Sequence, residues 1–88
     1  MKIKSGFLLH TVGNEHVVVA VGERTAAFHG MIRLNASGVF LWERLQSDTT
    51  EDALVAALCE HYDVSAETAR EAVRTFAAQL AAADVLEA

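Results

Sequence analysis

The spacing of hydrophobic residues changes from every second position to helical spacing near Asn35. Before it, Ile32 and Leu34 fall on one face of an extended segment and Arg33 on the other, the pattern of a half-buried strand. Asn35 suits a helix N-cap, because its short side chain can accept hydrogen bonds from the orphan amides of a first turn. The helix that follows is expected to bury one stripe, made of Val39, Trp42 and Leu45.

Two segments rich in β-formers precede this junction, at 7–12 and 16–21. Gly13 and Asn14 between them tolerate positive φ, so the pair predicts a β-hairpin. A third strand is expected at 31–34, after a connection at 23–30.

The second strand contains a run of apolar residues rather than an alternation, so neither face is clearly polar. One face must pack on the helices. The other, carrying some of Leu8, Val18 and Ala20, is available to a second subunit, to a partner enzyme or to the chain's own N-terminus. A thin strand pair covered by its own ends is an equally good interpretation.

A second helix is expected to begin at Glu51, because residues 46–50 form a polar loop rich in N-cap residues. Glu51 and Asp52 place negative charge in its first turn, which the helix dipole favours. Helical spacing predicts one buried stripe, and Asp63 interrupts the pattern. The expected stripe consists of Leu54, Ala57, Leu58, His61 and Tyr62.

A third helix is expected from Ser65 to about Ala83, with Val85 and Leu86 folding back on the core. Its predicted core face consists of Ala69, Ala72, Val73, Phe76, Leu80 and Ala83. The flank beside Val73 combines arginines with small residues, namely Arg70, Arg74, Ala77 and Ala81. Two interpretations remain for this flank: a shallow positive surface, or a solvated edge whose arginines pair with Glu67 and Glu71.

Composition narrows the functional classes. The 88 residues predict one domain with a small core, and the formal net charge of −5, with seven scattered Lys and Arg, argues against a nucleic-acid binder. Cys59 is the single cysteine, which excludes an internal disulfide and fits a reducing compartment. Without a long apolar run or a signal-peptide pattern, the chain is expected to be cytoplasmic and not membrane-bound.

Catalytic and metal-site patterns are weak in this sequence. The four histidines, His10, His16, His29 and His61, have no further ligands at metal-site spacing, although His10 and His16 could approach across the hairpin. Cys59 and His61 point to different faces of a helix, so they do not make a nucleophile and base pair. No glycine-rich phosphate loop is present. A binding role is therefore favoured over catalysis, with no metal or cofactor.

Three segments together resemble one protein family: the strand Val17-Val18-Val19, the junction from Met31 to Trp42, and Tyr62-Asp63-Val64 before the last helix. The chain resembles the PqqD family, coenzyme PQQ synthesis protein D and its stand-alone relatives that act as recognition elements for the precursors of ribosomally made, modified peptides. The resemblance extends from about Phe7 to Leu86. The ending Ala-Ala-Ala-Asp-Val-Leu departs from the family's Gly-Leu-Leu, so the turn there is not carried over.

This resemblance implies an α+β, winged-helix-like fold, with a three-stranded antiparallel sheet followed by three helices and no catalysis or cofactor of its own. It also implies a ligand, the leader segment of a precursor peptide, held as an added strand beside the third strand and against the last helix. The implied partner is a radical SAM or other modifying enzyme, in PQQ or related biosynthesis. The implied peptide-binding residues are Met31, Ile32, Arg33, Leu34, Arg70, Val73, Arg74, Ala77 and Ala81.

The side chains of the last helix suggest how it would contact such a leader. Ala77 and Ala81 would leave room for leader side chains and Val73 would offer apolar contact, while Arg70 and Arg74 would suit an acidic leader. Two other classes remain open. One is a winged-helix DNA-binding regulator, and the other is a structural dimer that uses the spare sheet face.

Overall fold

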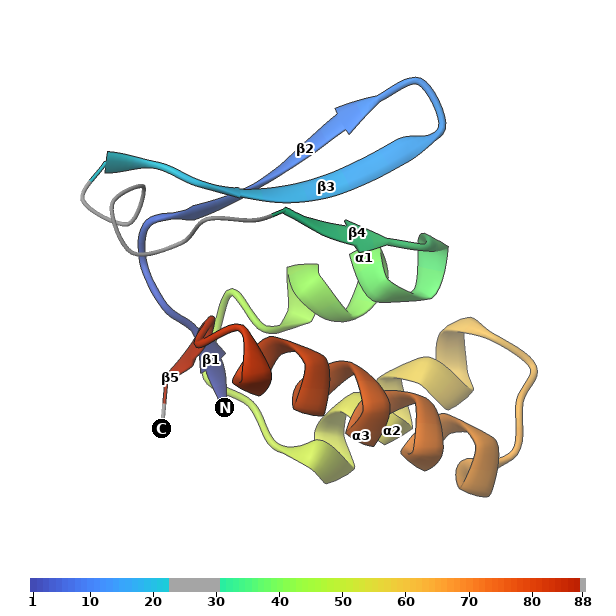
Figure 1. Ribbon diagram of the computed structural model, residues 1–88. Helices are drawn as coiled ribbons and strands as arrows, with labels where there is room; N and C mark the ends of the chain where they lie inside the picture. Colours follow the sequence, from blue (N-terminus) through green and yellow to red (C-terminus); the bar gives the residue numbers. More distant parts are fainter. Residues whose placement is uncertain (23–30, 88) are drawn as a thin grey trace.

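A computed structural model describes residues 1–22 and 31–87 of the chain (Figure 1). The expected connection at 23–30, with His29 and Gly30, lies outside the described residues. The elements in order are β1 (Lys2–Ile3), β2 (Phe7–Val12), β3 (Glu15–Ala20), β4 (Ile32–Leu34), α1 (Ala36–Arg44), α2 (Glu51–His61), α3 (Ala66–Ala82) and β5 (Leu86–Glu87). The expected α+β fold, a three-stranded antiparallel sheet followed by three helices, is confirmed.

Strands β2, β3 and β4 form the sheet in that order, with antiparallel pairing throughout. The register places Leu9, Val18 and Ile32 side by side across the three strands. The predicted hairpin is present, and Gly13 in its turn has a φ of +61°, a backbone angle that glycine adopts without strain. Strand β4 begins at Ile32, one residue later than expected.

The strand-to-helix junction is built as the sequence predicts. The side-chain Oδ1 of Asn35 accepts a hydrogen bond from the Gly38 amide at 2.8 Å, which caps α1. Thr50 and Ser65 cap α2 and α3 in the same way, so both helices begin where the cap residues predict. No helix among the described residues is long and apolar enough to cross a membrane.

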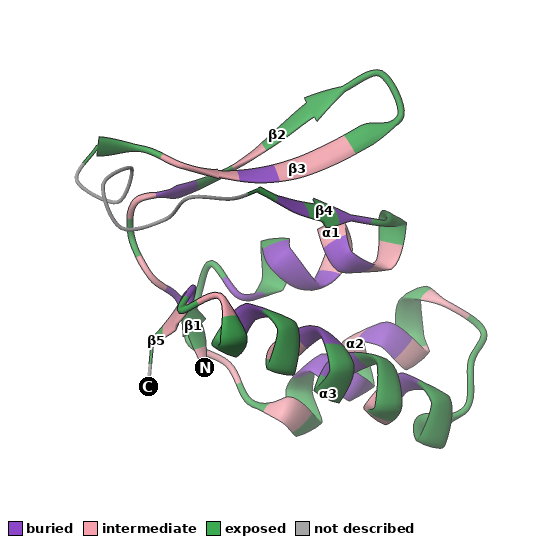
Figure 2. Cartoon of the chain, viewed as in Figure 1, coloured by how far each residue is buried: buried purple, intermediate pink, exposed green. Residues whose placement is uncertain are grey.

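The core lies where the inner face of the sheet meets the three helices, and the buried positions in Figure 2 face this interior. Trp42 of α1 and its C-cap Leu45 are buried as expected, together with Leu41, whereas Val39 of the predicted stripe is only half-buried. The stripe predicted for α2 is only partly correct. The buried residues of α2 are Leu54, Val55 and Leu58, so Val55 joins the buried face although it was not expected there. His61, which was expected in the stripe, is exposed.

The two faces of the sheet differ from the expected assignment at two residues, Val18 and Ala20, and Ala20 packs against the core opposite Phe7. Val18 is completely buried and lies on the core face, which follows from its position between Leu9 and Ile32. Leu8 lies on the outer face, because side chains alternate along a strand. That outer face carries exposed apolar side chains, with Leu8 56% exposed and Val12 62% exposed.

A second, two-stranded sheet joins the two ends of the described chain, and the hydrophobic pattern did not predict it. Ile3 of β1 pairs with Leu86 of β5, close to the C-terminal end of α3 (Figure 1). Val85 is completely buried, which confirms that the end of the chain folds back on the core. The turn before it forms although glycine is absent, because Asp84 adopts a positive φ of 60°.

Candidate functional site

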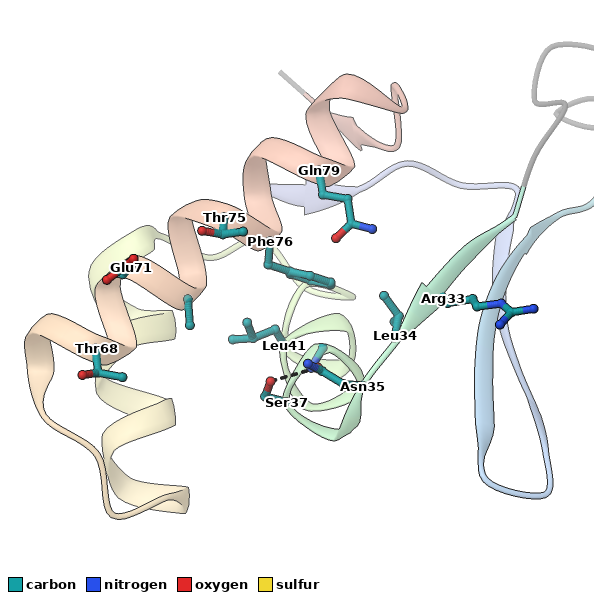
Figure 3. Close-up of a pocket in the computed structure, with 12 residues that line it drawn as sticks. Arg33, Leu34, Asn35, Ser37, Leu41, Thr68, Glu71, Thr75, Phe76 and Gln79 are labelled. Atoms are coloured by element: carbon teal, nitrogen blue, oxygen red, sulfur yellow. Dashed lines mark hydrogen bonds between the residues drawn. The ribbon is translucent and has the colours of Figure 1, made fainter.

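A groove with a volume of about 410 Å³ separates β4 and the start of α1 from α3 (Figure 3). We call it the β4–α3 groove. Its strand and α1 side consists of Arg33, Leu34, Asn35, Ser37, Gly38 and Leu41. Its α3 side consists of Thr68, Glu71, Ala72, Thr75, Phe76 and Gln79.

The floor of the groove is apolar and its α3 wall is mostly neutral and polar. Leu34, Leu41 and Phe76 line it while remaining at least 90% buried, so they offer flat apolar surface from below. In Figure 3, Phe76 and Gln79 project from α3 toward β4, and Leu34 lies on the side of the strand that faces Phe76. The groove can therefore hold apolar side chains at its centre and polar groups near α3.

Strand β4 is an edge strand whose outer edge borders this groove. One side of β4 pairs with β3, and no strand within residues 1–22 or 31–87 pairs with the other side. An edge of this kind presents backbone amide and carbonyl groups that an extended segment can pair with. Arg33 lies on this strand but points away from α3 (Figure 3), and its Nη1 lies 3.9 Å from Oε1 of Glu15.

The arginines expected at the site lie on another side of α3, against α2. Arg70 donates from Nη2 to Oδ1 of Asp52 at 2.8 Å and from Nη1 to Oε2 of Glu51. Arg74 donates from Nε to Oε1 of Glu51 at 3.0 Å. Pairing with Glu67 and Glu71, the second interpretation from the sequence, is thus replaced by pairing between helices.

These contacts shift the ionisation of both partners. The hydrogen bond from Arg74, followed by the one from Arg70, lowers the pKa of Glu51 against the opposing effect of desolvation. Hydrogen bonds to Asp52 and then to Glu51 raise the pKa of Arg70. The positive charge of this flank is thus already matched by carboxylates of α2. The arginines that a DNA-reading helix would need are held in the same pairs.

The structure does not bring the two halves of the predicted site together. Arg33 and Leu34 border the groove, but none of the five residues predicted on α3 lines it. Val73 is 1% exposed and belongs to the core, so a ligand cannot contact it without unpacking the helix. Ala77 and Ala81 lie on the same flank as the arginines, at helical positions turned away from the groove-lining residues. The groove lining thus does not include the residues predicted on α3, and their binding role stays a prediction.

The groove-lining residues of α3 were missed because the sequence pattern places a core stripe between two flanks. Ala72 was expected in the core, yet it is exposed and lines the groove. The flank made of Thr68, Thr75 and Gln79 lacks lysine and arginine and carries small or neutral side chains. That composition, together with the acidic first turn of α2 available to the arginines, was the signal that could have identified it.

The histidines do not assemble into a site among the described residues. His16 pairs opposite Thr11, with 2.9 Å between its Nδ1 and the Thr11 hydroxyl, so His10 lies on the opposite sheet face. His61 stacks on Phe40 with 4.5 Å between ring centroids. Within residues 1–22 and 31–87, no group of three His, Cys, Asp or Glu side chains could hold a metal ion.

Comparisons with known proteins agree with this architecture. A comparison with curated proteins finds no match. A solved structure described as "TbiB1 in Complex with the TbiA(beta) Leader Peptide" is similar, with a TM-score of 0.77, 25% sequence identity, and coverage of 99% of this chain and 95% of that chain. The sequence model of the family described as coenzyme PQQ synthesis protein D (PqqD) matches residues 15–86. The match spans most of the sequence, and the chain therefore belongs to the PqqD family.

Proposed function

We propose that this protein binds the leader segment of a ribosomally synthesised precursor peptide in the β4–α3 groove. The single observation that supports this most strongly is the unpaired edge of β4 beside an apolar floor, bounded by α3 on the far side. Family membership and the similarity to TbiB1, a protein solved with a leader peptide, support the choice of ligand.

We further propose that the leader adds to β4 as a strand. Backbone hydrogen bonds to the edge would supply affinity, and the groove would supply specificity through alternate side chains. About five or six leader residues would fill one strand of ordinary length. The groove volume of about 410 Å³ lies within the range of established ligand sites.

The proposed site consists of the edge of strand β4 at 32–34 and the groove-lining residues of α3 between Thr68 and Gln79. Met31 is 62% exposed beside the strand and is retained at its edge. The binding role predicted for Arg70, Val73, Arg74, Ala77 and Ala81 stays a prediction that their placement does not support.

The proposed role is that of a non-catalytic recognition protein which presents its leader to a modifying enzyme. A radical SAM enzyme is the partner we propose, on the basis of membership in a family described by coenzyme PQQ synthesis. Genes for such an enzyme and for a short precursor, beside the gene for this chain, are the expected genomic context.

A second candidate role is self-association through the outer face of the sheet. It is favoured by the exposed apolar side chains of Leu8, Val12 and Met31 on that face. Sedimentation at increasing protein concentration tests it, and we expect the substitution Leu8→Lys to lower the association constant. A constant monomer mass at every concentration would contradict this role.

The leader-binding proposal is tested by titrating isotopically labelled protein with a synthetic leader from the neighbouring precursor gene. We expect the amide resonances of 32–34 and of the Thr68–Gln79 wall to shift together. Amides on the arginine flank should move much less. Shifts confined to other elements, or no shifts at saturating peptide, would overturn the proposed site.

A further inference from the structure

We propose that the β4–α3 groove selects leaders with an apolar anchor over Phe76 and a basic side chain paired with Glu71. This inference rests on the proposed function and adds the chemical class of the ligand. It also reverses the charge expected from the arginines, which favoured an acidic leader.

The charge of the α3 wall supports this choice. Among the groove-lining residues of α3, Glu71 is the one ionised side chain, and it is exposed. No ion pair joins Glu71 to any residue in the described part of the chain. Glu67 lies one turn earlier but outside the groove lining, so Glu71 is the carboxylate of this wall.

The nearest cations on α3 are already held elsewhere. Arg74 follows Glu71 by three residues, but its Nε is hydrogen-bonded to Glu51 of α2. Arg70 is engaged by both Asp52 and Glu51. On the α3 wall, the carboxylate of Glu71 is therefore the charged group that a peptide in the groove would contact.

The depth of the groove specifies the length of the pairing side chain. Helical spacing places Phe76 at the floor, Ala72 and Thr75 above it, and Glu71 toward the rim. A leader side chain that leaves the strand near the floor must cross the Ala72 and Thr75 surface to reach Glu71. Lysine and arginine suit this path, because their apolar stems can lie on that surface while the charged head reaches the rim.

The strand side of the groove does not offset this preference. Arg33 points away from α3 and lies 3.9 Å from Glu15 on the neighbouring strand (Figure 3). Side chains of an added strand that enter the groove lie on the face of Leu34 and not of Arg33. An acidic leader side chain in the groove would face Glu71, while the nearby Arg33 points away from α3 and Arg74 is hydrogen-bonded to Glu51.

The test begins with a random peptide library displayed on phage and selected on the full chain. We expect the recovered peptides to contain an apolar residue and a lysine or arginine at a fixed spacing. Selection on the variant Glu71→Gln should lose the basic residue and keep the apolar one. The matched control Glu67→Gln, one turn away and outside the groove lining, should keep both.

A recovered peptide then serves in a double-mutant cycle. Replacing its basic residue with glutamine should weaken binding about two- to fivefold in the wild-type protein, as expected for an exposed charge pair. The same replacement should have no effect in Glu71→Gln, and the difference should shrink as salt is added.

Three contrary outcomes have different meanings. Peptides that require an open groove, tested by their loss in Ala72→Arg, but show no basic preference would overturn this inference and leave the proposed function standing. Selection that yields no peptide sensitive to Ala72→Arg would overturn both. Enrichment of acidic residues dependent on the groove would overturn the charge assignment alone.

Discussion

Arg74 donates a hydrogen bond to Glu51 across the interface between α3 and α2, with 3.0 Å between Nε and Oε1. The same carboxylate accepts a hydrogen bond from Arg70. This pairing lies on the flank of α3 away from the groove, so it holds the groove wall from behind. Substitutions there should change the stability of the protein without entering its proposed binding surface.

We expect Glu51→Gln to lower the free energy of unfolding at neutral pH, because the two guanidinium groups lose their shared carboxylate. The folded pKa of Glu51 is lowered, so its stabilising contribution is present above the ordinary glutamate pKa of about 4.3. That contribution is lost as the pH falls through the lowered pKa. Denaturant unfolding at a series of pH values should show the wild-type advantage shrinking toward acid pH.

Glu60→Gln on the same helix is the matched control for this experiment. Glu60 is exposed and forms no ion pair with a described residue, so its variant should track the wild-type stability at every pH. An equal loss in both variants would show that helix charge, rather than the Arg74 contact, explains the effect.

Arg74→Glu is expected to destabilise the protein more than Arg74→Gln, because a second carboxylate would face Glu51. Affinity for a groove-binding peptide, measured on fully folded protein, should stay at the wild-type value. A salt-dependent loss of peptide affinity in this variant would show that the arginine flank contributes to peptide binding.

Ala72→Arg is expected to block the groove, since Ala72 is exposed on its α3 wall. Peptide affinity should fall at least about tenfold, equivalent to ~1.4 kcal/mol, with little change in unfolding free energy. Ala78→Arg introduces the same side chain at an exposed position of the same helix that does not line the groove. Fluorescence titration should show unchanged peptide affinity for that control. Similar losses of affinity in both variants would contradict peptide binding in the groove.

Asn35→Ala is expected to cost about 1 kcal/mol of unfolding free energy, because the Gly38 amide loses its cap at the start of α1. Asn35→Asp keeps an acceptor oxygen and should retain most of the stability. Chemical denaturation of the three proteins measures both effects. Equal losses for alanine and aspartate would show that the cap contributes little.

Asp84 provides a test of the turn that follows α3. Its φ of 60° is strained for most side chains, so Asp84→Val should be about 1–2 kcal/mol less stable than Asp84→Gly. Both variants lose the ion pair with Lys4, so their difference isolates the backbone. Equal stability of the two variants would contradict the strained turn.

Local patterns in the sequence predicted much of the fold. The caps Asn35, Thr50 and Ser65 depend on neighbours within a few residues, and the three helices begin as expected. The pairing of β1 with β5 depends on residues at opposite ends of the sequence, and two-residue strands carry no periodic signal. His61 was assigned to the core because spacing alone does not tell the edge of a stripe from its centre.

The residues predicted for the site coincide with the groove lining on the strand side, at Arg33 and Leu34, and not on the α3 side. The junction at 32–35 is marked by its own residues, so the strand side followed from the sequence. A helical wheel defines a core stripe on α3 but not which flank meets α2 and which meets β4. Which flank meets α2 depends on how α3 is oriented against the other elements. In the structure, the flank with Arg70 and Arg74 meets α2 beside Glu51.

The pairing of Ile3 with Leu86 also affects the order in which the groove can be completed during folding. Contacts between residues so far apart in sequence raise the contact order, and their loop-closure entropy must be overcome before they stabilise the chain. The hairpin of β2 and β3 and the capped helices involve much shorter loops. We expect the C-terminal attachment of α3 to form late, after the hairpin and after α3 has packed against α2, so that this last contact fixes a groove wall that is already in place.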